Sequence, residues 1–196
     1  MKRKLLILSV LAICIATLAA GSLAFFTSEG TAHNVITTGG VEITVQEWAD
    51  EAKKTPFEDL EGIMPGMTVT KIAEIKNTGA SDAWIRVLVT KKIQLAGDGT
   101  PNTALVELNL NLTDWTQGTD GYLYYTKEAL KPGEVTAPLF TTVTFNAAMG
   151  NEYQNATATV DVTAQAVQTA NNGDTAMAAM GWPSTSTGGT SSAVTG

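Results

Sequence analysis

The chain has 196 residues, with 19 acidic and 12 basic side chains, and its formal net charge at pH 7 is −7. Binding of nucleic acid needs clustered Lys and Arg, and an acidic surface repels phosphate backbones and anionic lipid, so we expect no nucleic-acid partner. The only cysteine, Cys14, lies in an apolar leader. The rest of the chain therefore has no disulfide and must be stabilised by its core or by assembly.

Residues 1–24 are predicted to be a secretory signal peptide. Residues 2–4 are basic, and residues 5–20 are almost all apolar or small. Ser22 and Ala24 occupy the −3 and −1 positions of a cleavage site, which predicts a mature N-terminus at Phe25. A retained anchor is the alternative, because the uncharged run is long enough for a spanning helix of roughly 20 residues. Under the first reading the protein meets the membrane only before cleavage and is then extracellular.

Cleavage after Ala24 makes the protein more acidic. It leaves 172 residues with 9 basic and 19 acidic side chains, a net charge of −10. This length is sufficient for one domain with a hydrophobic core.

Alternation of apolar and polar residues dominates the mature chain and predicts half-buried strands. The pattern directs Leu112 inward and Gln165 outward. Gly, Pro and Asn mark turns between the strands, notably at Pro65-Gly66, Asn77-Thr78-Gly79 and Pro132-Gly133. In chain order, the predicted strands are about 41–45, 67–76, 83–90, 106–112, 121–126, 139–146 and 155–166.

These strands predict an all-β fold, a two-sheet antiparallel sandwich with jelly-roll or immunoglobulin-like topology and at most one or two short helices. The helical candidate is residues 46–54, QEWADEAKK, in which Asp50 and Lys54 form an i,i+4 pair. The predicted sandwich domain covers residues 25–170. Residues 171–196 are rich in Gly, Ser and Thr and predict a flexible tail, in which Met177, Met180 and Trp182 are candidates for docking on the body.

Side chains that could carry catalysis are few. His33 is the only histidine, whereas a zinc motif such as H-E-x-x-H needs two, and we interpret His33 as an exposed strand residue. Carboxylates between residues 47 and 61, or Asp114 with Asp120, are candidates for calcium binding, but they lack the alternating spacing of a calcium loop. A solvated acidic surface is the favoured interpretation. We predict no catalytic residue, no metal site and no cofactor.

Arg86 lies in the middle of the apolar run WIRVLV. A charged side chain in so apolar a strand needs a carboxylate or carbonyl partner. We therefore predict that Arg86 has a structural pairing role.

Three blocks of the sequence together resemble the TasA/CalY (camelysin) family of secreted proteins from Gram-positive bacteria. They are residues 5–45, residues 63–89 (IMPGMTVTKIAEIKNTGASDAWIRVLV) and residues 130–145 (LKPGEVTAPLFTTVTF). Each short motif alone is weak, and their order and spacing carry the resemblance. The most specific parts are LAFFT followed by TTGGVEI, then Pro65, Gly66, Asn77, Gly79, Arg86, Pro132 and Gly133.

The resemblance implies a jelly-roll-like subunit that polymerises into extracellular fibres of the biofilm matrix. It also implies that a dedicated SipW-type peptidase cuts the signal peptide, and that the N-terminal segment of one mature subunit completes the sheet of its neighbour. The implied partners are copies of the chain itself and other matrix components. Camelysin-type members carry a metalloprotease annotation, but this chain has no zinc motif.

The predicted polymerisation segment is residues 25–38, with Phe25 and Phe26 at its free end and Val35 and Ile36 before the glycine pair. An added strand gains affinity through main-chain hydrogen bonds, and head-to-tail repetition of such a contact builds an open filament. Three alternatives remain open. The segment could be an edge strand of its own sandwich, and the protein could be a cell-surface adhesin or matrix-binding module. A camelysin-type metalloprotease is the third and least favoured alternative.

Overall fold

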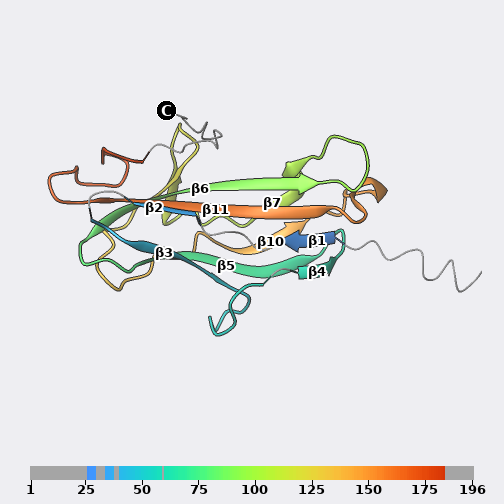
Figure 1. Ribbon diagram of the computed structural model, residues 1–196, viewed down its shortest axis with the longest axis horizontal. Coiled ribbons are helices and arrows are strands. Elements are labelled where there is room, and N and C mark those ends of the chain that lie inside the picture. The colour runs from blue at the N-terminus through green and yellow to red at the C-terminus, as the bar shows by residue number, and fades with distance from the viewer. Residues whose placement is uncertain (1–25, 30–33, 38–39, 59, 184–196) are drawn as a thin grey trace, which may run out of the picture.

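The computed structural model describes residues 26–29, 34–37, 40–58 and 60–183 as an elongated sandwich of two β-sheets (Figure 1). The first sheet has the strand order β4-β1-β11-β6-β9-β8, and β2 also pairs with β11. Its strands are β1 (Phe26–Glu29), β2 (Asn34–Thr37), β4 (Leu60–Ile63), β6 (Ala83–Gln94), β8 (Trp115–Gln117), β9 (Leu123–Tyr125) and β11 (Thr157–Gln168).

The second sheet has the order β3-β5-β10-β7. Its strands are β3 (Ile43–Trp48), β5 (Thr68–Asn77), β7 (Val106–Leu108) and β10 (Phe140–Phe145). The helices of the described chain are two short 3₁₀ segments, η1 (Thr103–Leu105) and η2 (Asn151–Tyr153). The prediction of an all-β, two-sheet sandwich is therefore confirmed.

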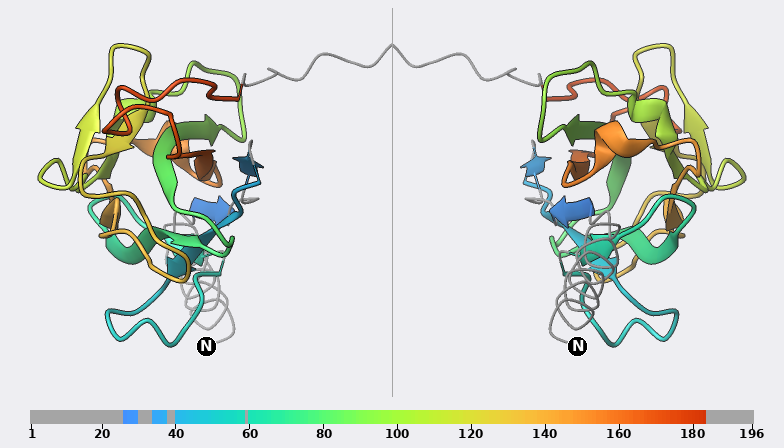
Figure 2. Two further views of the ribbon diagram at one scale, coloured as in Figure 1. Left: turned by 90° about the vertical axis from the view of Figure 1, so that its left-hand side faces the viewer. Right: turned by 90° about the vertical axis from the view of Figure 1, so that its right-hand side faces the viewer.

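The two N-terminal strands differ from the rest in direction. β1 and β2 run parallel to β11, whereas the other pairs of described strands are antiparallel. Figure 2, which views the molecule from its two ends, places these blue strands at one side of the sandwich.

The core lies between the sheets and is filled by the inward residues of the alternating strands. The alternation predicted for β11 is confirmed on its inner face, where Ala158, Val160, Val162, Ala164 and Ala166 are all buried. The largest side chains buried in this core are Trp115, Phe140 and Phe145. Burial of such aromatic area is the main source of stability in a fold without disulfides.

Two inward and outward assignments are wrong. Leu112 is 63% exposed, because β7 ends at Leu108 and the chain turns at Asn111, whose side-chain oxygen accepts from Thr113 N and Asp114 N at 3.3 Å. Gln165 is 0% exposed, because other side chains cover the outer face of β11 at that point.

The predicted helix at residues 46–54 is also wrong. Residues 46–48 belong to β3, and a loop follows. The Asp50 carboxylate accepts from the backbone N–H groups of Lys54 and Thr55, the latter at 2.7 Å. An Asp side chain that accepts from nearby backbone N–H groups competes with helix formation. The i,i+4 spacing of Asp50 and Lys54 therefore serves a loop hydrogen bond rather than a helical ion pair.

The packed domain extends beyond residue 170. Residues 171–183, which the sequence assigns to the tail, form a strap that buries Ala176 and Ala179 against the outer face of the first sheet. The Asn172 side chain closes the strap by bonding both the nitrogen and the oxygen of Met180, at 2.8 and 3.1 Å. Trp182 docks on the body, whereas Met177 and Met180 are exposed. Residues 184–196 lie outside the described part.

Candidate functional site

β11 is the longest strand of the first sheet together with β6, and its two edges are occupied differently. One edge pairs with β6 along its whole length, from Thr157 to Gln168. Among the described residues, the other edge pairs with β1, at residues 157–159, and with β2, at residues 163–166. We call these two strands the N-terminal arm. The predicted polymerisation residues Phe26, Val35 and Ile36 lie in the arm, and Phe25 lies outside the described residues.

β1 is not an edge strand. It lies between β11, with Thr27 opposite Thr157, and β4, with Phe26 opposite Ile63. Withdrawal of β1 would therefore expose unpaired backbone groups on two strands at once, and such groups are a template for another strand. The β1 position is a slot with hydrogen-bonding partners on both walls.

The arm joins the body at a glycine. Gly40 has φ +75°, a conformation that L side chains rarely adopt, and nothing lies within 4 Å of the position a Cβ would take. The body holds the chain from the next residues onward, because Val41 is buried and the Glu42 carbonyl accepts from both Thr78 N and Gly79 N at 2.9 Å. Gly40 is thus the point where a fixed body meets the arm.

Four residues of the motifs noted in the sequence meet the backbone of Glu42 or one another beside this junction. They are Asn77, Gly79, Pro132 and Gly133, and we call this region the root. The fully buried Asn77 side chain donates to the carbonyls of Ser81 and Leu130 at 2.8 and 2.7 Å. Its oxygen accepts from Gly79 N at 2.9 Å. A Cβ on Gly79 would lie 2.7 Å from Glu42 N, so only glycine fits.

The Pro132-Gly133 turn belongs to the same root. Gly133 has φ +82°, Glu134 N donates to Lys131 O at 3.0 Å, and Gly133 N donates to Asn77 O at 2.9 Å. These features are those of a type II turn, which needs positive φ at its third residue and favours Pro at its second.

The Pro65-Gly66 turn lies elsewhere, directly after β4. Gly66 has φ +81°, and Met67 N donates to Met64 O at 3.0 Å, which is again a type II pattern. Gly66 N also donates to Phe145 O at 2.7 Å, which ties the turn to β10. This motif therefore fixes the strand that forms one wall of the β1 slot.

Arg86 finds its carboxylate partner in Asp120, at 3.2 Å from the guanidinium. The Arg86 guanidinium also donates to Gln165 at 2.8 Å and to the Tyr124 hydroxyl at 3.0 Å. It lies 3.9 Å from the Tyr122 ring centroid and 4.6 Å from that of Trp182. These contacts explain the burial of Gln165 and hold the strap through Trp182. The predicted structural role of Arg86 fits them.

Two pKa values respond to this cluster. Partial burial works to raise the pKa of the Asp120 carboxyl, but hydrogen bonds from Tyr124 and from the Tyr122 backbone, together with the Arg86 charge, bring it below its ordinary value. Burial and the Asp120 hydrogen bond raise the pKa of the Tyr124 phenol. Asp120 is thus an ionised partner of Arg86 at neutral pH.

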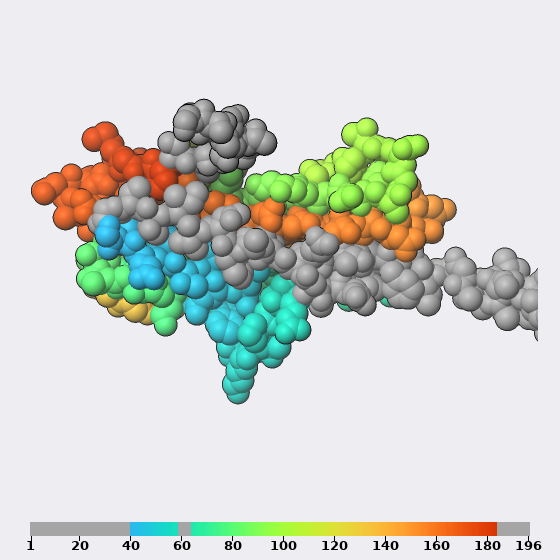
Figure 3. Space-filling view, in the orientation of Figure 1, coloured from blue at the N-terminus to red at the C-terminus, as the bar shows by residue number. Residues whose placement is uncertain are grey.

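Two carboxylates of the acidic stretch that suggested calcium binding have structural partners: Glu47 forms an ion pair and Asp50 bonds its own loop. Glu47 pairs with Lys71 at 3.0 Å, with both side chains buried, and Lys71 lies 4.4 Å from the Phe57 ring centroid. Lys53 and Trp48 both bond Glu74. These contacts anchor the loop of residues 49–58, which projects from the body in Figure 3. Among the described residues, no group of three or more His, Cys, Asp and Glu could hold a metal ion.

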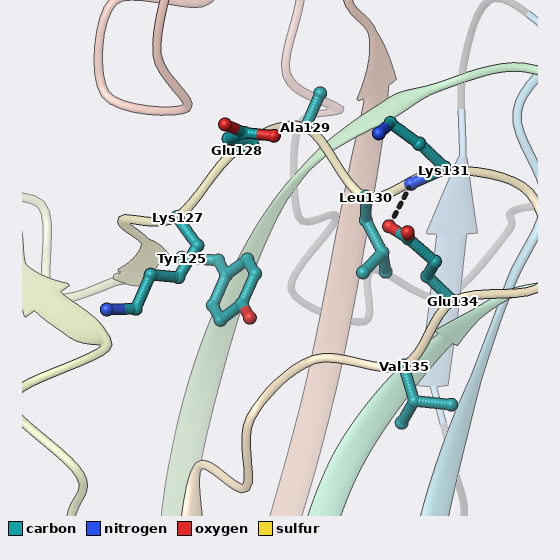
Figure 4. A pocket seen from close by; sticks show the side chains of 8 residues that line it. All are labelled: Tyr125, Lys127, Glu128, Ala129, Leu130, Lys131, Glu134 and Val135. Carbon is teal, nitrogen blue, oxygen red and sulfur yellow. Dashed lines mark hydrogen bonds between the residues drawn. The ribbon is translucent and has the colours of Figure 1, made fainter.

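A hollow of about 580 Å³ lies beside the 131–134 turn (Figure 4). The Glu134 carboxylate accepts from the Lys131 backbone N–H at 3.0 Å. The lining of the hollow mixes both signs of charge with apolar groups, and such a lining selects no ligand class. The lining residues are Tyr125, Lys127, Glu128, Ala129, Leu130, Lys131, Glu134 and Val135.

Several predicted features lie outside the described residues, namely Ser22, Ala24, Phe25 and His33. No helix in the described part of the chain has the length and apolar character needed to cross a membrane. The sequence-based prediction did not identify β4 as a wall of the β1 slot or Glu42 as the anchor of the root. The glycine at position 79 was the sequence feature that indicated a close backbone contact. That the contact is made with Glu42 could not be identified from the sequence.

Comparison with known proteins found no match to any family model, to any curated protein or to any solved structure.

Proposed function

We propose that the mature protein is a secreted structural subunit that polymerises into extracellular biofilm-matrix fibres by donor-strand exchange. A SipW-type peptidase removes the signal peptide, and the N-terminal arm of one subunit then completes the first sheet of another. The single observation that supports this most is the position of β1, between β11 and β4. A strand near the start of the chain fills a slot that the arm of another copy can fill equally well.

Main-chain pairing makes the exchange nearly neutral in energy. Each hydrogen bond that the arm loses at home is remade on the neighbour, so assembly need not overcome a large loss of pairing. Exchange of an identical element is a low-cost route to oligomers, and repeated head-to-tail exchange gives an open filament. The glycine at position 40 provides the backbone freedom for the arm to leave.

In this proposal, removal of the signal peptide determines when the arm can be exchanged. β1 begins at Phe26, two residues beyond the predicted cleavage point, so an uncut signal peptide would keep the free end of the arm at the membrane. Removal of the signal peptide releases that end and permits exchange. The extracellular destination and the lack of a mature cysteine are consistent with a fibre held by pairing rather than by disulfides.

A reversible lock on the arm tests the proposal. Asn34 and Thr163 are direct partners across β2 and β11, so N34C/T163C in the mature protein can form a disulfide that holds the arm at home. We expect fibres by electron microscopy from the reduced variant and from the unmodified mature protein, and monomers from the oxidised variant. The single variants N34C and T163C are the controls for oxidation itself.

Fibres from the fully oxidised, intramolecularly linked variant would contradict donor-strand exchange. Monomers in every sample, with binding to cells or polysaccharide, would instead favour an adhesin or matrix-binding module.

A further inference from the structure

The root fixes the end of the molecule from which the arm can leave. Thr37, the last residue of β2, pairs with Ala166 near the end of β11, and Ile43, the first residue of β3, pairs with Asn77 at the end of β5. We call this the root end. β1 pairs with the beginning of β11, at Thr157, which lies at the opposite, far end (Figure 1).

An arm that leaves its own sheet stays tied to the root end. The Glu42 carbonyl is held by Thr78 and Gly79, so movement begins no later than Gly40. The strands of the arm can then extend only from the root end outward, at about 3.3 Å per residue. The acceptor molecule must therefore lie beyond the root end of the donor.

If the arm kept its parallel direction on the acceptor, Thr37 would again lie near Ala166, at the acceptor's root end. The two root ends would then face each other, and each molecule could accept the other's arm. Such a reciprocal contact is closed by a two-fold axis and gives a dimer.

A filament requires the other arrangement. When subunits repeat with one polarity, the donor's root end meets the acceptor's far end, where β11 begins at Thr157. The arm then enters with Thr37 near Thr157 and its free end pointing along β11 towards Gln168. This direction is antiparallel to β11 and parallel to β4.

We infer that, in the fibre, the N-terminal arm pairs antiparallel to β11 of the neighbouring subunit, reversed from its parallel pairing at home. The inference rests on the proposed function and specifies the contact between copies. Antiparallel pairing is slightly more stable per residue than parallel pairing. Along β11 the reversal replaces parallel pairing by antiparallel pairing, and along β4 it does the opposite. β11 holds seven of the arm's register pairs at home and β4 holds two, so the balance favours assembly.

Two pairs of cysteine substitutions distinguish the directions, since the mature chain has no other cysteine. Thr27→Cys with Thr157→Cys reports parallel pairing, because these residues are direct partners at home. Thr37→Cys with Thr157→Cys or Ala158→Cys reports antiparallel pairing, with one variant for each face of β11. At home Thr37 lies opposite Ala166, eight residues or about 26 Å along β11 from Ala158, so neither pair can close within one chain.

Each variant is assembled under reducing conditions, checked by electron microscopy, oxidised and run on a non-reducing gel. We expect fibres of T37C/T157C or T37C/A158C to give a ladder of covalent oligomers and fibres of T27C/T157C to give none. In the unassembled protein, only T27C/T157C should crosslink, within a single chain.

Fibres that give a ladder from T27C/T157C, or from none of the pairs, would overturn the antiparallel arrangement and leave the fibre function standing. Closed dimers crosslinked through T27C/T157C, with no fibres, would overturn both.

Discussion

Gly79 and Glu42 lie in backbone contact at the root of the N-terminal arm. Gly79 N donates to Glu42 O at 2.9 Å, and a Cβ on Gly79 would lie 2.7 Å from Glu42 N. Gly79→Ala should therefore displace Glu42 and lower the free energy of unfolding by about 1–3 kcal/mol, the usual cost of overpacking. Urea denaturation measures this change.

Gly97→Ala is the matched control, because Gly97 is exposed and nothing lies within 4 Å of its potential Cβ. It should leave the midpoint nearly unchanged. Equal midpoints for the two variants would show that the root tolerates movement of Glu42.

The guanidinium group of Arg86 should be needed for full stability of the domain. Arg86→Ala leaves Gln165 and Asp120 without their donor and removes the stacking partner of Trp182, so we expect a loss of about 2–3 kcal/mol. Arg86→Lys should recover only part of this loss, because an ammonium cannot reproduce the planar fork or the stacking. Limited proteolysis should cut the strap faster in both variants.

Lys92→Ala provides the comparison for loss of a charge. Lys92 pairs with Asp161 from an exposed position, so its removal should change stability by less than about 1 kcal/mol. A strap as resistant in Arg86→Ala as in Lys92→Ala would contradict the docking role of Arg86.

The strands with one buried face could be predicted from sequence, because burial on one face imposes a period of two. β3 and β11 lie where their alternation places them, and β5, β6 and β10 lie where runs rich in Val, Ile, Thr and aromatic residues place them. β4 and β8 are short strands, and their pairing depends on neighbours distant in sequence. Gln165 was misplaced because the strap and two tyrosines turn an outer face into a second buried layer.

The candidate site was predictable only in part. Glycine in the turns at Gly66 and Gly133 follows from local backbone geometry, so both turns were identifiable. The parallel direction of β1 and its position inside the sheet were not, because main-chain pairing leaves no signature in side chains. The helix expected at residues 46–54 failed because the Asp50 carboxylate bonds the backbone of its own loop.

The buried pair of Lys71 and Glu47 should show strong coupling. Lys71→Met leaves the Glu47 carboxylate buried without a counter-charge and should cost about 3–5 kcal/mol. The double variant K71M/E47L removes both charges and should be more stable than Lys71→Met alone. A double-mutant cycle by urea denaturation measures the coupling. Additive losses from the two single changes would show that the charges do not depend on each other.

Assembly should become faster as the pH falls from 7 towards the sequence pI of about 4.6. Protonation then reduces the net charge, which is −10 for the predicted mature chain, and with it the repulsion between subunits. The Asp120 contribution should survive in this range. The folded pKa of Asp120 lies below the ordinary value of 3.8. The stability it adds is therefore present above the unfolded pKa and is lost only as pH falls through the lower, folded value. Light scattering across pH 4.6–7 measures the assembly rate. Urea midpoints at each pH distinguish an effect of charge on assembly from unfolding of the subunit.

Added salt at pH 7 should also accelerate assembly, because it screens the same repulsion between subunits. Rates that ignore both pH and salt would show that charge does not limit assembly.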